Sequence, residues 1–147
     1  MAKGGPLKLR KRTKRYFLLF FWAVVGTGTL DWIFDKWVRV QGAFGPEHHP
    51  LQPWISRAHT ASAYLILISF GYLLHSHVRP GLKGKRKKVS GIAIVTFLSI
   101  LAASSLPILY AADGMIRDTS TAVHTYMGLS IPLLLGIHLW WRKNDTA

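Results

Sequence analysis

Histidine is the residue type in this chain whose chemistry and placement suggest a functional site. The chain has seven histidines, and five of them lie in, or just after, two long apolar stretches: His59, His75, His77, His124 and His138. Ionisable side chains within a membrane are costly and usually functional, and neutral imidazole is a good ligand for iron. These five residues are therefore candidate metal ligands.

The spacing of the histidines predicts which rings share a helix face. His124 and His138 are 14 residues apart, which at about 100° per residue returns to within about 40° of the start and spans about 21 Å. His59 and His77 are 18 residues apart, or about five full turns and 27 Å. His75 falls on the opposite face of a regular helix. Helix tilt or a local irregularity at Gly71 could absorb the longer span. Such an irregularity could also turn His75 inward, so His75 remains the alternative to His77.

Four apolar segments must position these histidines. They cover residues 16–34, 54–74, 89–112 and 121–141. Each has about 20 residues, the length with which a helix crosses the hydrocarbon core. Pro80 and Gly81 predict the end of the second helix. Ser104, Ser105 and Pro107 predict a bent third helix. Because the loops are short, we expect an all-α, up-down transmembrane four-helix bundle.

Basic residues predict the orientation of this bundle. Most of the 19 Lys and Arg residues lie in the N-terminal tail, in the loop between the second and third helices, and after the fourth helix. Retention of Lys and Arg in the cytoplasm puts both termini inside. The expected organisation is a basic tail over 1–15, a four-helix transmembrane domain that carries the helix histidines over 16–142 and a C-terminal tail over 143–147. The charge of +13 then reflects topology and contact with anionic membrane lipid, and not nucleic-acid binding.

The depths of the histidines predict two haem sites. The second and fourth helices run in the same direction, so His59 and His124 share the outer level. His77, or His75, shares the inner level with His138. A b-type haem takes two imidazoles on opposite faces of one iron. The absence of cysteine excludes thiolate ligation, iron–sulfur clusters and covalent c-type haem.

Other residues are candidates for contact with these haems. Arg57 lies two residues before His59, and we expect Arg117 in the last outer loop. Both arginines could pair with the propionates of the outer haem. Arg79 and Arg142 could pair with those of the inner haem. Anchoring at the interface is the alternative for these arginines. Small residues could admit the porphyrin or simply pack helices: Gly26, Gly28, Ala63, Gly128 and Gly136. His48 and His49 are expected to be loop residues, with contact to a quinone, a metal or a docking partner as the alternative.

Two motifs resemble a known family. The segment His124-Thr-Tyr-Met-Gly-Leu-Ser-Ile-Pro132-Leu-Leu-Leu-Gly-Ile-His138 has the ligand spacing and mid-helix proline of the cytochrome b subunit of bc-type complexes. His77-Val-Arg-Pro-Gly-Leu82 looks like the sequence after an inner ligand in that family. In size the chain is more similar to the small four-helix bacterial di-haem cytochromes b. The resemblance covers residues 54–142, and the spacing of 16 or 18 on the second helix departs from it.

These features predict a function in transmembrane electron transfer. The resemblance implies two b haems in a bacterial inner membrane, with electrons passing between the quinone pool and a c-type cytochrome or another oxidoreductase subunit. The chain is too short for a separate catalytic domain, which indicates an electron-transfer subunit, and a quinone is a further candidate ligand. One alternative is a non-redox structural or pigment-binding subunit. Another is a proton or metal-ion transporter, although the helices carry almost no buried carboxylates.

Overall fold

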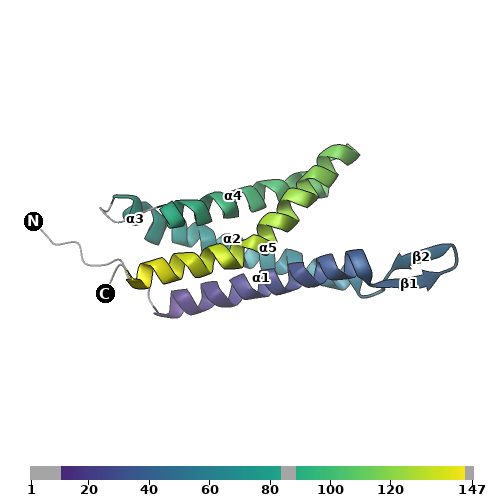
Figure 1. Ribbon diagram of the computed structural model, residues 1–147, viewed down its shortest axis with the longest axis horizontal. Coiled ribbons are helices and arrows are strands. Elements are labelled where there is room, and N and C mark those ends of the chain that lie inside the picture. The colour runs from purple at the N-terminus through teal and green to yellow at the C-terminus, as the bar shows by residue number, and fades with distance from the viewer. Residues whose placement is uncertain (1–10, 84–88, 145–147) are drawn as a thin grey trace, which may run out of the picture. The chain divides into compact units, whose positions relative to one another are not determined.

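The computed structural model describes residues 11–83 and 89–144 and is mostly helical (Figure 1). Four helices are long and apolar enough to span a membrane: Lys11–Trp37, Gln52–Leu82, Val89–Tyr110 and Gly114–Trp141. The chain is therefore built as a multi-pass integral membrane protein. It divides into two compact units, Met1–Gly84 and Lys85–Ala147. Each unit is a helical hairpin and is described by itself.

The first hairpin consists of α1 (Lys11–Trp37) packed against α2 (Gln52–Leu73). Its core is small and lies between the two helices, with Phe21, Ile66, Phe70 and Leu73 buried. Pro53 occupies the first turn of α2, where its missing N–H costs no hydrogen bond. Both helices agree with the segments predicted from hydropathy, but α1 starts earlier and ends later.

The second helix does not end at Pro80 and Gly81, contrary to the sequence prediction. A π-helical segment, Leu74–Val78, follows α2 and leads directly into the short helix α3 (Arg79–Lys83). Proline within a regular α-helix clashes with the carbonyl of the preceding turn. The wider π turn immediately before Pro80 relieves this clash, so helical structure continues. The irregularity expected at Gly71 is thus found three residues later.

The segment between α1 and α2 contains a β-hairpin that the sequence reading treated as a loop. Strands β1 (Arg39–Gly42) and β2 (Gly45–His48) pair antiparallel, with Arg39 opposite His48. Gly45 has φ +125, a left-handed conformation that glycine adopts without steric cost. In Figure 1 this hairpin projects beyond the end of α1.

The second hairpin consists of α4 (Val89–Tyr110) packed against α5 (Gly114–Asn144). α5 begins seven residues before the predicted start at 121, because the Asp113 carboxylate accepts the Ile116 N–H at 2.9 Å and caps the helix. α5 bends along its length in Figure 1. Pro132 lies inside the helix and accounts for the bend, because it removes one backbone hydrogen bond.

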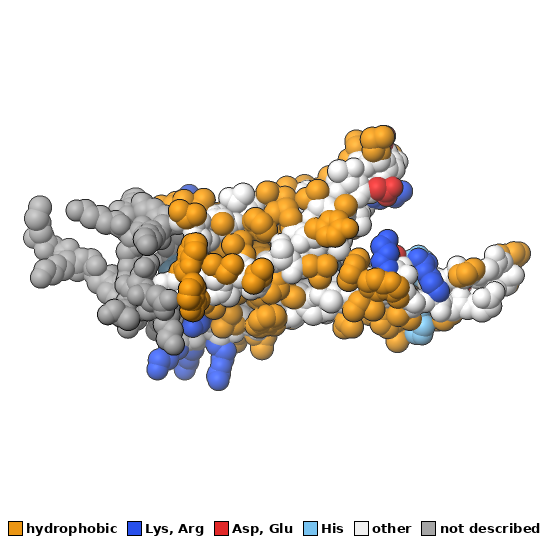
Figure 2. Space-filling model, in the orientation of Figure 1, with side chains coloured by type: hydrophobic (Ala, Val, Ile, Leu, Met, Phe, Trp, Pro, Cys, Tyr) orange, Lys and Arg blue, Asp and Glu red, His pale blue; other side chains and the backbone are white. Residues whose placement is uncertain are grey.

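Apolar side chains are mostly on the outside of the described helices (Figure 2). Exposed positions include Trp22, Ile68, Leu109, Tyr126 and Leu133, whereas in the second hairpin only Ile131 and Leu135 are buried among the described residues. A soluble protein rarely exposes apolar surface over such an area. Helices that face lipid have this distribution, in agreement with their length and hydropathy.

Candidate functional site

His59 is held within the first hairpin by two groups of α1. Its ring nitrogen Nδ1 lies 3.2 Å from the carbonyl oxygen of Val24 and 3.3 Å from the hydroxyl of Thr27. A carbonyl oxygen can only accept, so Nδ1 donates. The Thr27 proton is directed at the Ala23 carbonyl at 2.7 Å, so its oxygen accepts as well. In the neutral ring the proton is therefore on Nδ1 and the lone pair on Nε2.

Gly28 allows the His59 ring to approach α1 closely. A Cβ atom at Gly28 would lie 2.7 Å from Cε1 and 3.0 Å from Nδ1 of His59, closer than van der Waals contact permits. By contrast, a Cβ at Gly26 would meet nothing within 4 Å. Of these two glycines, Gly28 is thus the one required by the position of the ring.

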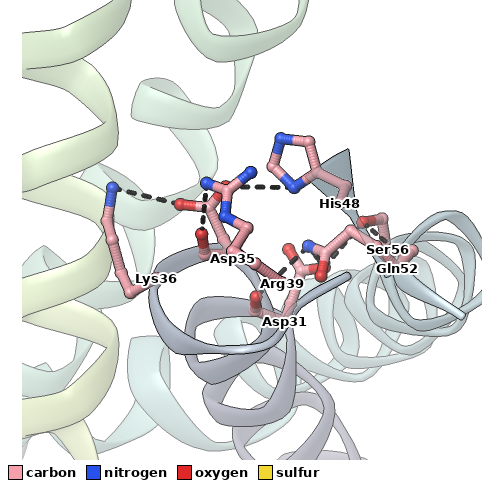
Figure 3. Close-up of polar contacts among 7 residues, drawn as sticks. All are labelled: Asp31, Asp35, Lys36, Arg39, His48, Gln52 and Ser56. Atoms are coloured by element: carbon pink, nitrogen blue, oxygen red, sulfur yellow. Dashed lines mark hydrogen bonds and ion pairs between the residues drawn. The ribbon is translucent and has the colours of Figure 1, made fainter. Parts of the chain in front are cut away.

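A polar cluster lies one turn beyond His59 toward the β-hairpin (Figure 3). The Asp31 carboxylate accepts hydrogen bonds from Ser56 Oγ at 2.6 Å and from Gln52 Nε2 at 3.0 Å. Gln52, Ser56 and His59 follow one another at helical spacing, so one face of α2 carries all three polar side chains. Oε1 of Gln52 is buried without a hydrogen-bond partner among the described residues.

In the second hairpin, two histidines of α5 contact serines of α4. His124 Nδ1 lies 3.0 Å from Ser104 Oγ, and His138 Nδ1 lies 2.9 Å from Ser90 Oγ. Ser104 Oγ also lies 3.1 Å from the Leu101 carbonyl, so its single proton can be donated either to that carbonyl or to His124 Nδ1.

The two serine–histidine pairs share one register. Ser90 and Ser104 are 14 residues apart on α4, as His124 and His138 are on α5. Because the two helices run antiparallel, equal spacing brings both pairs together at once. Both rings therefore lie on the side of α5 that faces α4, which agrees with the phase calculated for a regular helix.

His75 and His77 differ in their surroundings. Both lie in the π-helical segment Leu74–Val78, where the rotation per residue is smaller than in an α-helix. The count of five full turns from His59 to His77 therefore does not hold as calculated. The side chain of His77 is half-buried, whereas that of His75 is exposed. This contrast supports His77 as the better candidate within the first hairpin.

The arginine candidates are less constrained than the histidines. Arg57 is exposed and lies over the Trp54 ring, 4.8 Å from its centroid, a cation–π contact. Arg117 is exposed in the first turn of α5 and not in a loop as predicted. Arg79 is exposed at the start of α3. Arg142 belongs to α5, but its side chain lies outside the described part of the structure.

Gly128 does not mark a tight helix contact. A Cβ at this position would lie 3.9 Å from the Leu101 side chain, an ordinary van der Waals distance. Gly136 has nothing within 4 Å of such an atom. Neither glycine is therefore required for the packing of α5 on α4.

His49 lies in a connecting segment, as predicted, whereas His48 lies in a β-strand and not in a loop. His48 belongs to β2, and its Nδ1 is 3.9 Å from an Asp35 carboxylate oxygen (Figure 3). His49 Nδ1 accepts the Leu51 N–H at 3.1 Å, and its ring meets the Phe34 ring edge-on. These contacts give both residues a structural explanation at the junction between β2 and α2.

The helix histidines have the chemistry that haem ligation requires. Ligating histidines characteristically donate their second ring N–H to a neighbouring acceptor, which fixes the ring and its tautomer. His59 does so through Nδ1, and His124 and His138 each meet a hydroxyl at the same atom. Within residues 11–83 and 89–144, no three His, Asp or Glu side chains form a cluster that could hold a metal ion. A haem needs no such cluster, because the porphyrin supplies four ligands and the protein at most two.

Comparison with protein-family models, curated proteins and solved structures found no match to this chain. The evidence for its function is therefore the geometry of the site.

The hydroxyls that contact the histidines were not predicted from the sequence. Thr27 and Ser90 were not singled out, and Ser104 was assigned only to a helix bend. The equal spacing of Ser90–Ser104 and His124–His138 was a usable signal, because equal spacing on antiparallel neighbours allows both pairs to meet. Asp31 and its partners Gln52 and Ser56 gave no such signal, since contacts between helices depend on the packing of α1 on α2.

Proposed function

We propose that this protein is a di-haem cytochrome b that carries electrons across a membrane. The observation that supports it best is the common setting of three helix histidines. His59, His124 and His138 each direct Nδ1 at a hydroxyl of the neighbouring helix. This is the arrangement by which proteins orient imidazoles that ligate a metal through Nε2.

The proposed ligand pairs follow the depths predicted from the sequence. His59 and His124 would hold one haem at the outer level. His77 and His138 would hold the second at the inner level, with His75 as the alternative to His77. This pairing supposes that the two hairpins assemble as an up-down four-helix bundle with both termini in the cytoplasm of a bacterium. The charge distribution supports that orientation.

In this proposal each residue has a defined task. When bound, haem supplies one-electron redox chemistry at its iron. Thr27, Ser104 and Ser90 keep the rings in one orientation, and the Val24 carbonyl holds a proton at Nδ1 of His59. The apolar helices exclude water from the ligands, which helps to set the reduction potential. Two haems at two depths would connect the quinone pool with a c-type cytochrome or another oxidoreductase subunit.

An absorption spectrum of the purified full chain tests the proposal. A dithionite-reduced b-type cytochrome shows sharp α and β bands, and pyridine haemochrome analysis of the same sample should give about two haems per chain. A non-redox subunit that binds chlorophyll would show pigment bands instead, and a scaffold or transporter would show neither. Absence of haem from protein expressed with sufficient haem supply would overturn the proposal.

A further inference from the structure

A groove at the basic end of the first hairpin has the features of a lipid-binding site. It has a volume of about 320 Å³ and is lined from both helices. α1 contributes Thr13, Tyr16 and Phe17, and α2 contributes Ile68, Ser69, Tyr72 and Leu73. Tyr16 and Tyr72 remain 59% and 56% exposed, so the groove is open along its tyrosine side.

The chemistry of the groove matches a phospholipid. Phe17 and Leu73 give it an apolar floor suited to an acyl chain, and Ile68 lies exposed at its edge. Thr13, Ser69 and the two tyrosines supply hydroxyls that can donate to ester or phosphate oxygens. Amphipathic tyrosines at this level are characteristic of the membrane–water interface.

Positive charge lies directly beside the groove. α1 opens with four exposed basic residues, and Figure 2 shows Lys and Arg side chains gathered where this helix begins: Lys11, Arg12, Lys14 and Arg15. Arg12 is one helical turn before Tyr16, about 40° away around the axis. Around the same axis Arg15 is about 100° from Tyr16 and about 160° from Thr13 and Phe17, so it points farther from the groove than Arg12 does.

We propose that this groove binds one anionic phospholipid, with an acyl chain between α1 and α2 and the phosphate beside Arg12. The charge complementarity selects an anionic headgroup over a zwitterionic one. The inference goes beyond electron transfer and does not depend on haem. It needs only α1 and α2 to span the membrane.

Native mass spectrometry of the delipidated full chain in detergent tests this site. Dioleoyl phosphatidylglycerol and dioleoyl phosphatidylcholine share their acyl chains and differ in net charge, so they serve as paired probes. We expect one phosphatidylglycerol to remain bound at concentrations where phosphatidylcholine is lost. Equal retention of the two lipids would overturn the proposal whatever any variant does.

Two arginine variants localise the binding. Arg12→Gln should weaken phosphatidylglycerol retention about fivefold, the loss expected for one basic residue beside an anionic headgroup. Arg15→Gln removes the same charge from a position that points farther from the groove and should change retention less than twofold. Equal effects of the two variants would show diffuse attraction instead of a site.

A third variant tests the groove itself. Ser69→Leu fills the groove and should reduce retention of phosphatidylglycerol without changing the net charge. Unchanged retention in this variant would place the lipid elsewhere.

Discussion

The two hairpins hold their histidines by the same type of contact but with different support. In the first hairpin, His59 has two acceptors on α1, the Val24 carbonyl and the Thr27 hydroxyl, and Gly28 admits its ring. In the second hairpin, one serine meets each of His124 and His138. The first hairpin therefore fixes one ring with redundant contacts, whereas the second repeats one contact at two depths.

This difference has a consequence for the proposed haem sites. In the second hairpin the two contacts depend on one register between α4 and α5, so a shift of either helix would disturb both. In the first hairpin His59 is fixed close to the Asp31 cluster, while His77 lies within the π-helical segment. The proposed outer ligand, His59, thus lies in a regular helix, whereas the proposed inner ligand, His77, lies where the helix is irregular.

The largest expected effect is the loss of one haem on removal of either α5 histidine. His124→Ala and His138→Ala should each reduce haem content from about two to about one per chain, because each removes one proposed axial ligand. Pyridine haemochrome analysis measures the stoichiometry. His49→Ala, in the segment before α2, is the control and should keep both haems. Unchanged haem content in both α5 variants would discard the ligand assignment.

The inner ligand of the first hairpin is the next largest test. We expect His77→Ala to lose one haem and His75→Ala to keep two, because His77 is half-buried and His75 exposed. The same haem assay distinguishes the variants. The reverse result would show that the π-helical segment turns His75 toward the cofactor, and the two residues would exchange roles.

Removal of the Asp31 carboxylate should destabilise the first hairpin. Asp31→Ala deprives Ser56 and Gln52 of their shared acceptor, and we expect a loss of about 3 kcal/mol, since hydrogen bonds to charged groups contribute about 1.5–3 kcal/mol each. Asp35→Ala is the matched control. It removes an exposed ion pair with Lys36 and should cost less than about 1 kcal/mol. Denaturant unfolding in detergent, followed by circular dichroism, measures both values, and equal losses would mean that the Asp31 cluster adds no stability.

A methyl group at Gly28 tests the close approach of the His59 ring. Gly28→Ala should cost about 2 kcal/mol, within the range of about 1–3 kcal/mol for overpacking, because the ring must shift. In the second hairpin a Cβ at Gly91 would lie 3.7 Å from Cε1 of His138, so Gly91→Ala should be nearly neutral. The same unfolding assay compares them. Equal stability of the two variants would remove this distinction between the hairpins.

The smallest effect is on the tautomer of the rings. Ser104→Ala removes the hydroxyl that contacts His124 Nδ1, a contact of about 1 kcal/mol, and should shift the balance between the two neutral tautomers of His124. Thr27→Val should leave His59 protonated at Nδ1, because the Val24 carbonyl remains. Nitrogen-15 NMR of labelled histidine in protein prepared without haem reports the tautomer. A change at His59 as large as that at His124 would show that the carbonyl gives no redundancy.

The sequence by itself determined the four membrane-spanning helices, because about 20 consecutive apolar residues have few alternatives in lipid. It also determined that His124 and His138 share a face of α5, since a nearly regular helix sets their phase. Only the tertiary structure decided which groups meet the rings, because Thr27, Ser90 and Ser104 become partners through packing between helices. It also decided the early start of α5, where the Asp113 carboxylate accepts a backbone N–H at the first turn. The π turn at His75 and His77 was likewise decided there, because the helix accommodates Pro80 and the α-helical rotation of about 100° per residue no longer applies.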